Sequence, residues 1–246
     1  MSKAIFTGMH GTVAPVVAKT FESHGIEVVS YDRERVTVDQ PIVIKTFLQT
    51  EQPDYFLHFA MGSPEWANLL ASLCQSLGIY FVYISTVSVY DGNLPGPYTI
   101  DSIADAKDSY GSYKRSSEVM VLDANPKSYI LRLSWQIGVS PGSNQMIDFL
   151  KKEMDQKGVV HASSKWYPSA TFIQDTAASI YDIITRLKPD IYLINANDRY
   201  SFYDIVSYLK TIHPWIHVKE STDFVQDMRM IDDRVIVKKL SSYIHH

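Results

Sequence analysis

The sequence predicts an α/β protein built on a doubly wound parallel sheet with helices on both faces. Apolar runs and segments of helical periodicity alternate along most of the chain, the order expected of strands joined by crossover helices. A glycine-containing turn separates the first apolar run from the first helical segment. The third run, Tyr55 to Phe59, is apolar almost throughout, as expected of a strand buried on both faces.

The composition fits a folded protein with a sizeable core. The chain has 246 residues, of which 46% are hydrophobic, enough for one large domain or two small ones. Lys and Arg number 23 against 27 Asp and Glu, a net charge of −4 that argues against a nucleic-acid partner. No apolar run reaches the roughly 18 residues of a membrane span.

The N-terminus and the cysteine count indicate the compartment. Met1 to Phe6 leads directly into an apolar strand, without the pattern of a signal peptide. The single cysteine, Cys74, excludes an intrachain disulfide and is expected to be buried filler. We therefore expect a cytoplasmic protein without a membrane partner. His245 and His246 resemble the end of a purification tag and carry no argument.

The first elements form the start of a βαβ unit. Lys3 to Phe6 is a strand, Val13 to Ser23 a helix and Ile26 to Tyr31 a second strand. Pro15 in the first helical turn and Gly25 just beyond the last one are typical of a helix start and end.

The turn within this unit has the spacing Gly8-x-x-Gly11-x-x-Ala14. Glycines there allow a tight turn and a close approach of a pyrophosphate to the helix N-terminus, and a small residue at Ala14 allows the helix to pack on the strand. A plain loop is the alternative. With a strand before it and a helix after it, the turn favours a Rossmann-like dinucleotide-binding site.

The second strand ends in Asp32 and Arg33. Asp32 follows Gly8 by 24 residues, close to the roughly 20 expected of a carboxylate that binds a ribose. A carboxylate favours the free 2′-hydroxyl of NAD, whereas an arginine favours the 2′-phosphate of NADP. Since both are present, the choice between NAD and NADP stays open, and a solvated turn is the alternative for Arg33.

The next elements continue the alternation. Helices are predicted at Pro41 to Thr50 and Trp66 to Leu77, with strands at Tyr55 to Phe59 and Ile79 to Ile84. His58 is expected to be a satisfied core histidine. The loop of Ala60, Met61, Gly62 and Ser63, and the hydroxyls of Ser85 and Thr86, follow two strands at the edge where parallel sheets bind ligands.

The second half alternates less regularly. Gly92 to Ala106 is predicted to be a loop over the site, followed by a helix at 108–122 and a strand at 128–133. We expect residues 1–135 to form the nucleotide-binding domain. Residues 136–246 would return in part to the sheet and in part form a substrate cleft. Further helices are expected at 146–154, 171–187, 202–212 and 235–243, and a strand at 191–196.

Tyr110 and Lys114 are four residues apart on the predicted helix at 108–122. This spacing places both side chains on one face, one turn apart. An ammonium close to a phenol lowers the tyrosine pKa from about 10 and makes the phenol a usable proton donor and acceptor. The pair alone also fits an ordinary solvated helix.

Taken together, these motifs resemble the extended short-chain dehydrogenase/reductases, and within them the dTDP-4-dehydrorhamnose reductases. The resemblance covers nearly the whole chain. The matching stretches are Thr7-Gly8-Met9-His10-Gly11, Tyr83 to Gly92, Tyr110-Gly111-Ser112-Tyr113-Lys114 with Glu118 (similar to Tyr-Gly-x-Thr-Lys and a Glu), Leu131-Arg132-Leu133-Ser134-Trp135, Trp166-Tyr167-Pro168-Ser169 and Met230-Ile231-Asp232.

The resemblance implies roles for individual residues. Tyr110 would donate the proton to a carbonyl oxygen, Lys114 would lower its pKa and hold the nicotinamide ribose, and Thr86 with Ser85 would bind the carbonyl or tune Tyr110. Val87 and Trp135 would face the substrate with Thr86, and no metal site is implied. The cofactor positions would be Gly8, His10, Gly11, Thr12 and Val13 at the pyrophosphate, Asp32 and Arg33 at the adenosine ribose, and Ala60, Met61, Gly62 and Ser63 at the middle of the cofactor.

The chain departs from the family pattern near the substrate. Val87 stands in place of an aspartate, His58 in place of an asparagine and Ile100 in place of a glutamate, and the segment after Met61 is short. The resemblance implies an NAD(P)-dependent reductase of a nucleotide-linked 4-keto-deoxysugar, and a homodimer. An epimerase or dehydratase with tightly bound NAD and a non-catalytic NAD(P)-binding regulatory subunit are the alternatives.

Overall fold

The computed structural model describes residues 2–90, 94–140 and 144–245. Its centre is a sheet of six strands in the order β10-β5-β4-β3-β1-β2, all paired in parallel. The predicted fold class is therefore confirmed. The strands are β1 (Lys3–Thr7), β2 (Glu27–Ser30), β3 (Tyr55–His58), β4 (Tyr80–Thr86), β5 (Tyr129–Leu133) and β10 (Ile191–Ile194).

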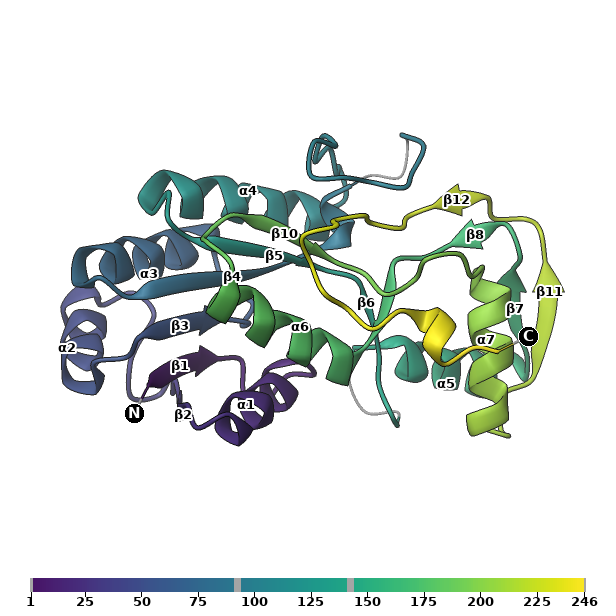
Figure 1. Cartoon of the computed structure of the whole chain (residues 1–246), viewed down its shortest axis with the longest axis horizontal. Coiled ribbons are helices and arrows are strands. Elements are labelled where there is room, and N and C mark those ends of the chain that lie inside the picture. The colour runs from purple at the N-terminus through teal and green to yellow at the C-terminus, as the bar shows by residue number, and fades with distance from the viewer. Residues whose placement is uncertain (1, 91–93, 141–143, 246) are drawn as a thin grey trace.

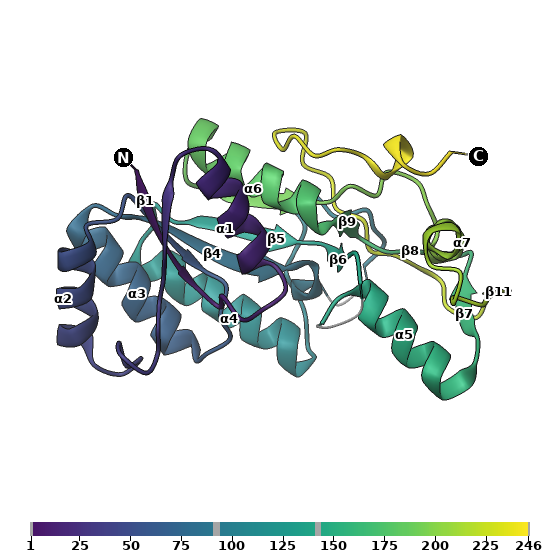
Figure 2. The same cartoon turned by 90° about the horizontal axis from the view of Figure 1, so that it is seen from below.

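Helices cover both faces of this sheet, as Figures 1 and 2 show. Successive residues of a strand point to opposite faces. Phe6 accordingly packs in one buried cluster with α1 and α6, whereas its neighbour Ile5 packs in a second cluster with α2 and α3. The helices around the sheet are α1 (Ala14–Ser23) and α6 (Ile173–Arg186) on one face, and α2 (Pro41–Glu51), α3 (Pro64–Leu77) and α4 (Ser109–Ala124) on the other.

A second lobe lies beyond the carboxyl ends of the strands (Figure 1). It consists of short parallel strand pairs and two helices around a core of its own. Its elements are β6 (Trp135–Ile137), α5 (Met146–Lys157), β7 (Val160–Ser163), β8 (Trp166–Tyr167), β9 (Ala170–Phe172), α7 (Phe202–Ile212), β11 (Val218–Ser221), β12 (Gln226–Asp227) and, near the C-terminus, the 3₁₀ turn η2 (Leu240–Ser242).

The helix predicted at 235–243 is wrong. The segment has no helix before η2, with Val235 buried and its neighbour Ile236 68% exposed. The carbonyl oxygen of Ile236 accepts a hydrogen bond from Ser179 Oγ at 2.8 Å, and Leu240 N donates to Ala196 O at 2.9 Å. These contacts with distant parts of the chain replace the bonds that a helix would make within itself.

The loop predicted over the site connects the two lobes. Asp91 and Gly92, which belong to the matched motif, lie outside the described residues. Further along the loop, Tyr98 N donates to Arg229 O at 2.7 Å, and Ile231 N donates to Tyr98 O at 2.8 Å. The Tyr98 ring is stacked on that of Tyr90, with 4.2 Å between the centroids. The loop therefore joins the end of β4 to the C-terminal part of the second lobe.

Two sequence-based expectations concern single features. Cys74 is buried in the core cluster beside α3, as predicted. Among the described parts of the chain, no helix is both long and apolar enough to cross a membrane.

Gly111 provides the first test of the fold. It lies in the first turn of α4, and a Cβ there would overlap the carbonyl oxygen of Ser88 and the methyl group of Ala106. Ala in place of Gly ordinarily stabilises a helix by about 1 kcal/mol. Here we expect Gly111→Ala to destabilise the protein by about 1–3 kcal/mol, because overpacking outweighs helix propensity.

Chemical denaturation measures this difference. Ser116→Ala, at an exposed position of the same helix, serves as the control and should be neutral or slightly stabilising. A gain in stability for Gly111→Ala would show that α4 is not in close contact with the segment before it.

Candidate active site

The carboxyl ends of the parallel strands meet at one edge of the sheet. The order of the sheet reverses between β1 and β3, because the chain passes from β1 to β2 on one side and then to β3 on the other. Such a switch point leaves a crevice at the carboxyl edge. The residues that follow β1, β2, β3 and β4 therefore surround one place.

The glycine turn after β1 has the geometry that the sequence indicated. Gly8 has a φ of +76°, and Gly11 N donates to Gly8 O at 2.8 Å. A Cβ on Gly8 would lie 3.0 Å from the main-chain nitrogen of Ala60, so a side chain there would be crowded as well as strained by the positive φ. The N-cap residue of α1 is Val13, whose apolar side chain cannot cap the first N–H groups of the helix. The main chain of the turn is therefore accessible just before α1. His10 and Gly11 are exposed there, and Thr12 is half-buried.

The two charged residues after β2 are directed differently. Asp32 Oδ1 accepts a hydrogen bond from Glu34 N at 2.9 Å and so supports its own turn. Arg33 reaches across to the end of β3, where its Nη2 donates to Met61 O at 2.6 Å. The guanidinium also lies 4.6 Å from the centroid of the Trp66 ring. A cation is therefore held in place at this end of the crevice.

The loop of Ala60 to Ser63 after β3 is anchored by its neighbours. Ala60 N donates to Thr7 Oγ1 at 3.0 Å, which ties the loop to the end of β1. Gly62 N donates to the phenol oxygen of Tyr113 at 3.2 Å. The Ser63 side chain caps α3 by accepting from Trp66 N at 3.3 Å.

His58 is a core residue, and only one of its ring nitrogens has a partner. Thr7 Oγ1 accepts from the main-chain nitrogens of Phe59 and Ala60, so the Thr7 proton is directed to His58 Nδ1, 3.0 Å away. Nε2 then carries the ring proton and, among the described residues, has no hydrogen-bond partner. Burial, with smaller contributions from the charges of Lys114 and Arg33, lowers the pKa of His58 to about 3, so the ring is neutral.

Tyr110 and Lys114 both face the end of β4 from the first turns of α4. Asp108 begins this helix, and its Oδ1 accepts from Tyr110 N at 2.9 Å. The Tyr110 side chain is 42% exposed, whereas that of Lys114 is buried. Lys114 Nζ donates to Ile84 O at 2.8 Å and lies 4.9 Å from the centroid of the Tyr83 ring.

The expected lowering of the Tyr110 pKa by Lys114 is wrong for this structure. Although Tyr110 is 42% exposed, partial desolvation of its phenol raises the pKa of Tyr110, and the neighbouring Thr86 side chain only partly opposes the rise. The Lys114 ammonium does not lower this pKa because it is directed to the Ile84 carbonyl instead. Burial lowers the pKa of Lys114 itself to about 8, against the opposing charge of Glu118.

Behind this pair lies a buried ion pair that sequence reasoning did not single out as functional. Arg132 on β5 donates to both carboxylate oxygens of Glu118 on α4, at 3.0 and 2.7 Å. Arg132 Nη1 also donates to the Tyr90 hydroxyl at 2.8 Å. The Ser85 hydroxyl donates to Glu118, so it is used inside this network instead of facing the crevice. Two features of the sequence could have indicated this pair: a charged residue, Arg132, within an apolar central strand, and an acid, Glu118, one helical turn after Lys114.

The expected substrate residues lie in different lobes. Val87 packs against the cluster that contains Tyr90 and Tyr98. Trp135 is half-buried, and its ring lies 5.3 Å from that of Phe149 and 5.8 Å from that of Phe202 in the second lobe. Over the described ranges, no cluster of acidic, His and Cys side chains could hold a metal ion.

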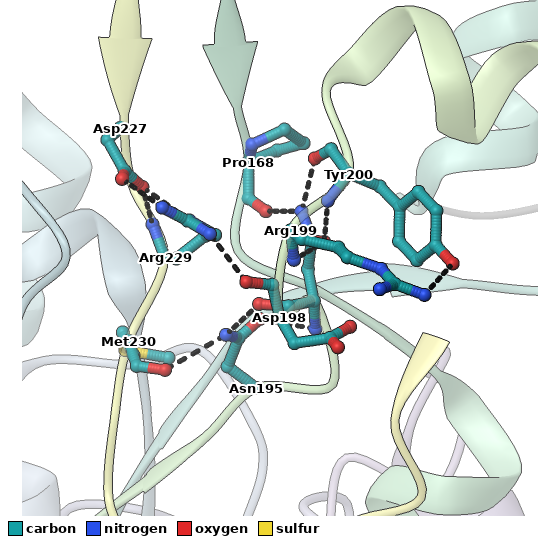
Figure 3. A network of polar contacts seen from close by, with 9 residues as sticks. Pro168, Asn195, Asp198, Arg199, Tyr200, Asp227, Arg229 and Met230 are labelled. Carbon is teal, nitrogen blue, oxygen red and sulfur yellow. Dashed lines mark hydrogen bonds and ion pairs between the residues drawn. The ribbon is translucent and has the colours of Figure 1, made fainter. Parts of the chain in front are cut away.

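A polar network holds the second lobe to the end of β10 (Figure 3). Asn195 Nδ2 donates to Met230 O at 2.9 Å, and Asn197 Nδ2 donates to Pro168 O at 2.8 Å. Arg229 Nη1 donates to the carbonyl oxygen of Asp198 in the same network. These groups satisfy one another, so the network holds the matched stretches around Pro168 and Met230 in place.

Comparisons with known proteins agree with this architecture. The family model described as "RmlD substrate binding domain" matches residues 65–209, more than half of the chain. The dTDP-4-dehydrorhamnose reductase of Aggregatibacter actinomycetemcomitans is 25% identical over 229 residues, which is 83% of this chain and 76% of the relative. The methionine adenosyltransferase 2 subunit beta of Xenopus tropicalis is 24% identical over 253 residues, 90% of this chain and 75% of the relative.

Among solved structures, the dTDP-4-dehydrorhamnose reductase of Bacillus anthracis in complex with NADP superposes with a TM-score of 0.84. The two are 16% identical, and the match covers 99% of this chain and 98% of the other. At this identity the likeness shows the fold, and the family-model match shows the kinship: the chain belongs to the RmlD substrate-binding domain family.

Proposed function

We propose that the protein is an NAD(P)-dependent reductase of a nucleotide-linked 4-keto-deoxysugar. One arrangement carries this proposal: Tyr110 and Lys114 on α4 lie beside Thr86 at the carboxyl end of β4, on the edge of the sheet that also holds the glycine turn. Membership of a family that includes sugar-nucleotide reductases supports it.

The residues at the crevice fit a nicotinamide dinucleotide. The turn at Gly8 disfavours a side chain, and the start of α1 offers main-chain N–H groups and the positive end of the helix dipole to a pyrophosphate. Asp32 and Arg33 would hold the adenosine ribose, the loop of Ala60 to Ser63 the middle of the cofactor, and Lys114 the nicotinamide ribose. When bound, the reduced cofactor supplies the hydride.

Tyr110 would give the proton to the sugar oxygen. Because burial raises its pKa, the phenol is protonated at neutral pH, which is the form that a donor requires. Thr86, next to the phenol, would orient it. Lys114 lies one helical turn further on, and the carboxylate of Glu118 helps to keep its ammonium charged inside the protein.

The second lobe and the end of β4 would supply the walls of the substrate site. Trp135 offers a half-buried aromatic face, and Val87 offers an apolar one from the end of β4. An apolar wall at Val87 favours a deoxygenated or otherwise less polar sugar at that position, because a hydroxyl without a hydrogen-bond partner is costly to bury.

A non-catalytic regulatory subunit is the second candidate, favoured by the similarity to a methionine adenosyltransferase subunit. A pure binding subunit has no need of Tyr110, Lys114 and Thr86 together. Absence of turnover with any sugar nucleotide, with a partner enzyme that co-purifies, would favour this candidate. An epimerase or dehydratase would instead retain NAD through purification.

Replacing Tyr110 tests the proton donor. We expect Tyr110→Phe to lower turnover by about 10²–10⁴, the usual contribution of general acid catalysis. The Kd for NADPH should stay within about twofold, because the ring remains. Steady-state kinetics and a fluorescence titration measure the two quantities. Tyr80→Phe, at the opposite edge of the sheet, is the control, and unchanged turnover in Tyr110→Phe would refute the assignment.

Replacing Lys114 tests how much burial of its charge lowers the stability of the fold. Folding lowers its pKa from 10.5 to about 8, so the unfolded chain binds more protons between these values. At pH 8 and below, burial of the charged form costs up to about 3 kcal/mol. Lys114→Met should therefore be more stable than the wild type at pH 7, and this advantage should shrink toward pH 10.5, while turnover is lost.

Denaturation curves at pH 7 and pH 10 measure this effect. Lys127→Met, at an exposed position after α4, is the control. A Lys114→Met variant that is less stable than the wild type at pH 7 would show that Lys114 has a net structural role.

Replacing Arg33 tests the choice of cofactor. The guanidinium is held beside the proposed adenosine site, where a 2′-phosphate would accept its charge-assisted hydrogen bonds. We expect Arg33→Ala to weaken binding of NADPH by about 10- to 100-fold and binding of NADH much less. The exposed Arg35 provides the control, Arg35→Ala. Equal losses for both nucleotides would rule out contact with the 2′-phosphate.

A further inference from the structure

Tyr113 lies between Tyr110 and Lys114 on α4 and points to the loop of Ala60 to Ser63, here called the cofactor loop. Its phenol oxygen accepts the hydrogen bond from Gly62 N at 3.2 Å. The similar family motif, Tyr-Gly-x-Thr-Lys, has a threonine at this position. A threonine hydroxyl is attached directly to Cβ, whereas the phenol oxygen lies at the far end of a ring. The contact to Gly62 therefore depends on the tyrosine of this chain.

The loop of Ala60 to Ser63 is held from several elements at once. Thr7 at the end of β1 binds its first residue, and Arg33 after β2 binds the carbonyl oxygen of Met61. Gly62 is pressed against the Trp66 ring of α3, since a Cβ there would overlap that ring. Of these contacts, the one made by Tyr113 comes from the helix that carries the proposed catalytic pair.

The Tyr113 ring also borders the Lys114 ammonium. Lys114 Nζ lies 5.7 Å from the centroid of this ring and 4.9 Å from that of Tyr83. A cation near aromatic faces is favoured when it is shielded from water. The same side chain thus contacts the loop with its hydroxyl and the surroundings of Lys114 with its ring.

We propose that Tyr113 is a positioning residue that holds the cofactor loop at a fixed distance from Lys114 before a nicotinamide nucleotide binds. This inference rests on the proposed function. A cofactor that touches both the loop and Lys114 requires a fixed distance between them. A hydrogen bond from α4 to the loop establishes that distance in the free protein, so less ordering has to accompany binding.

Tyr113→Phe keeps the ring and removes the phenol oxygen, which accepts from Gly62 N and also interacts with the Tyr83 hydroxyl. In the cofactor-free protein, we expect the Gly62 amide to exchange its hydrogen about fivefold faster, since its acceptor is gone. The Kd for NADPH should rise about two- to tenfold. The kcat at saturating cofactor should stay within about twofold. NMR exchange rates, a fluorescence titration and steady-state kinetics measure these three quantities.

Tyr80→Phe is the matched control, because it removes a phenol oxygen at the amino-terminal edge of the same sheet. An unchanged Gly62 exchange rate in Tyr113→Phe would overturn the proposal. So would faster exchange throughout the protein with a matching loss of stability, because Tyr113 would then act on the whole fold.

The exchange measurement also separates this inference from the proposed function. If the wild type binds neither NADPH nor NADH, the proposed function fails. Faster exchange confined to Gly62 and its neighbours would still support Tyr113 as the residue that holds the loop to α4, and unchanged exchange would overturn that role as well.

Discussion

The buried ion pair between Glu118 and Arg132 is the interaction on which the rest of the site depends. It joins α4 to β5, and through Ser85 and Tyr90 it also holds the end of β4 and the segment that leads to the second lobe. Both charges are taken out of water, so neither is tolerated without the other. Removal of one partner from a buried pair typically costs about 3–5 kcal/mol. The position of α4 against the sheet is therefore strongly constrained.

This constraint explains how charge is distributed around the crevice. Arg132 neutralises Glu118, yet the carboxylate still favours the charged form of Lys114 one turn away. Burial acts in the opposite direction on Lys114, raises the pKa of Tyr110 and keeps His58 neutral. The pKa values of Lys114 and Tyr110 are thus set by their surroundings more than by each other.

Much of the fold was predictable because it depends on local patterns. The six central strands and the helices around them were expected from apolar runs, helical periodicity and the glycine turn. The short strands of the second lobe have only two to four residues, too few for a periodic signal. The predicted helix at 235–243 was wrong because contacts with Ser179 and Ala196 override its local preference.

The sequence by itself determined the fold class, the glycine turn and the spacing of Tyr110 and Lys114, because each is a matter of neighbours along the chain. Only the tertiary structure decided what these groups touch. It directed Lys114 to the Ile84 carbonyl, joined Ser85 to Glu118 and brought Tyr113 to Gly62, 51 residues away in the chain. A pKa or a hydrogen bond depends on burial and distance in space, and spacing along the sequence does not specify either.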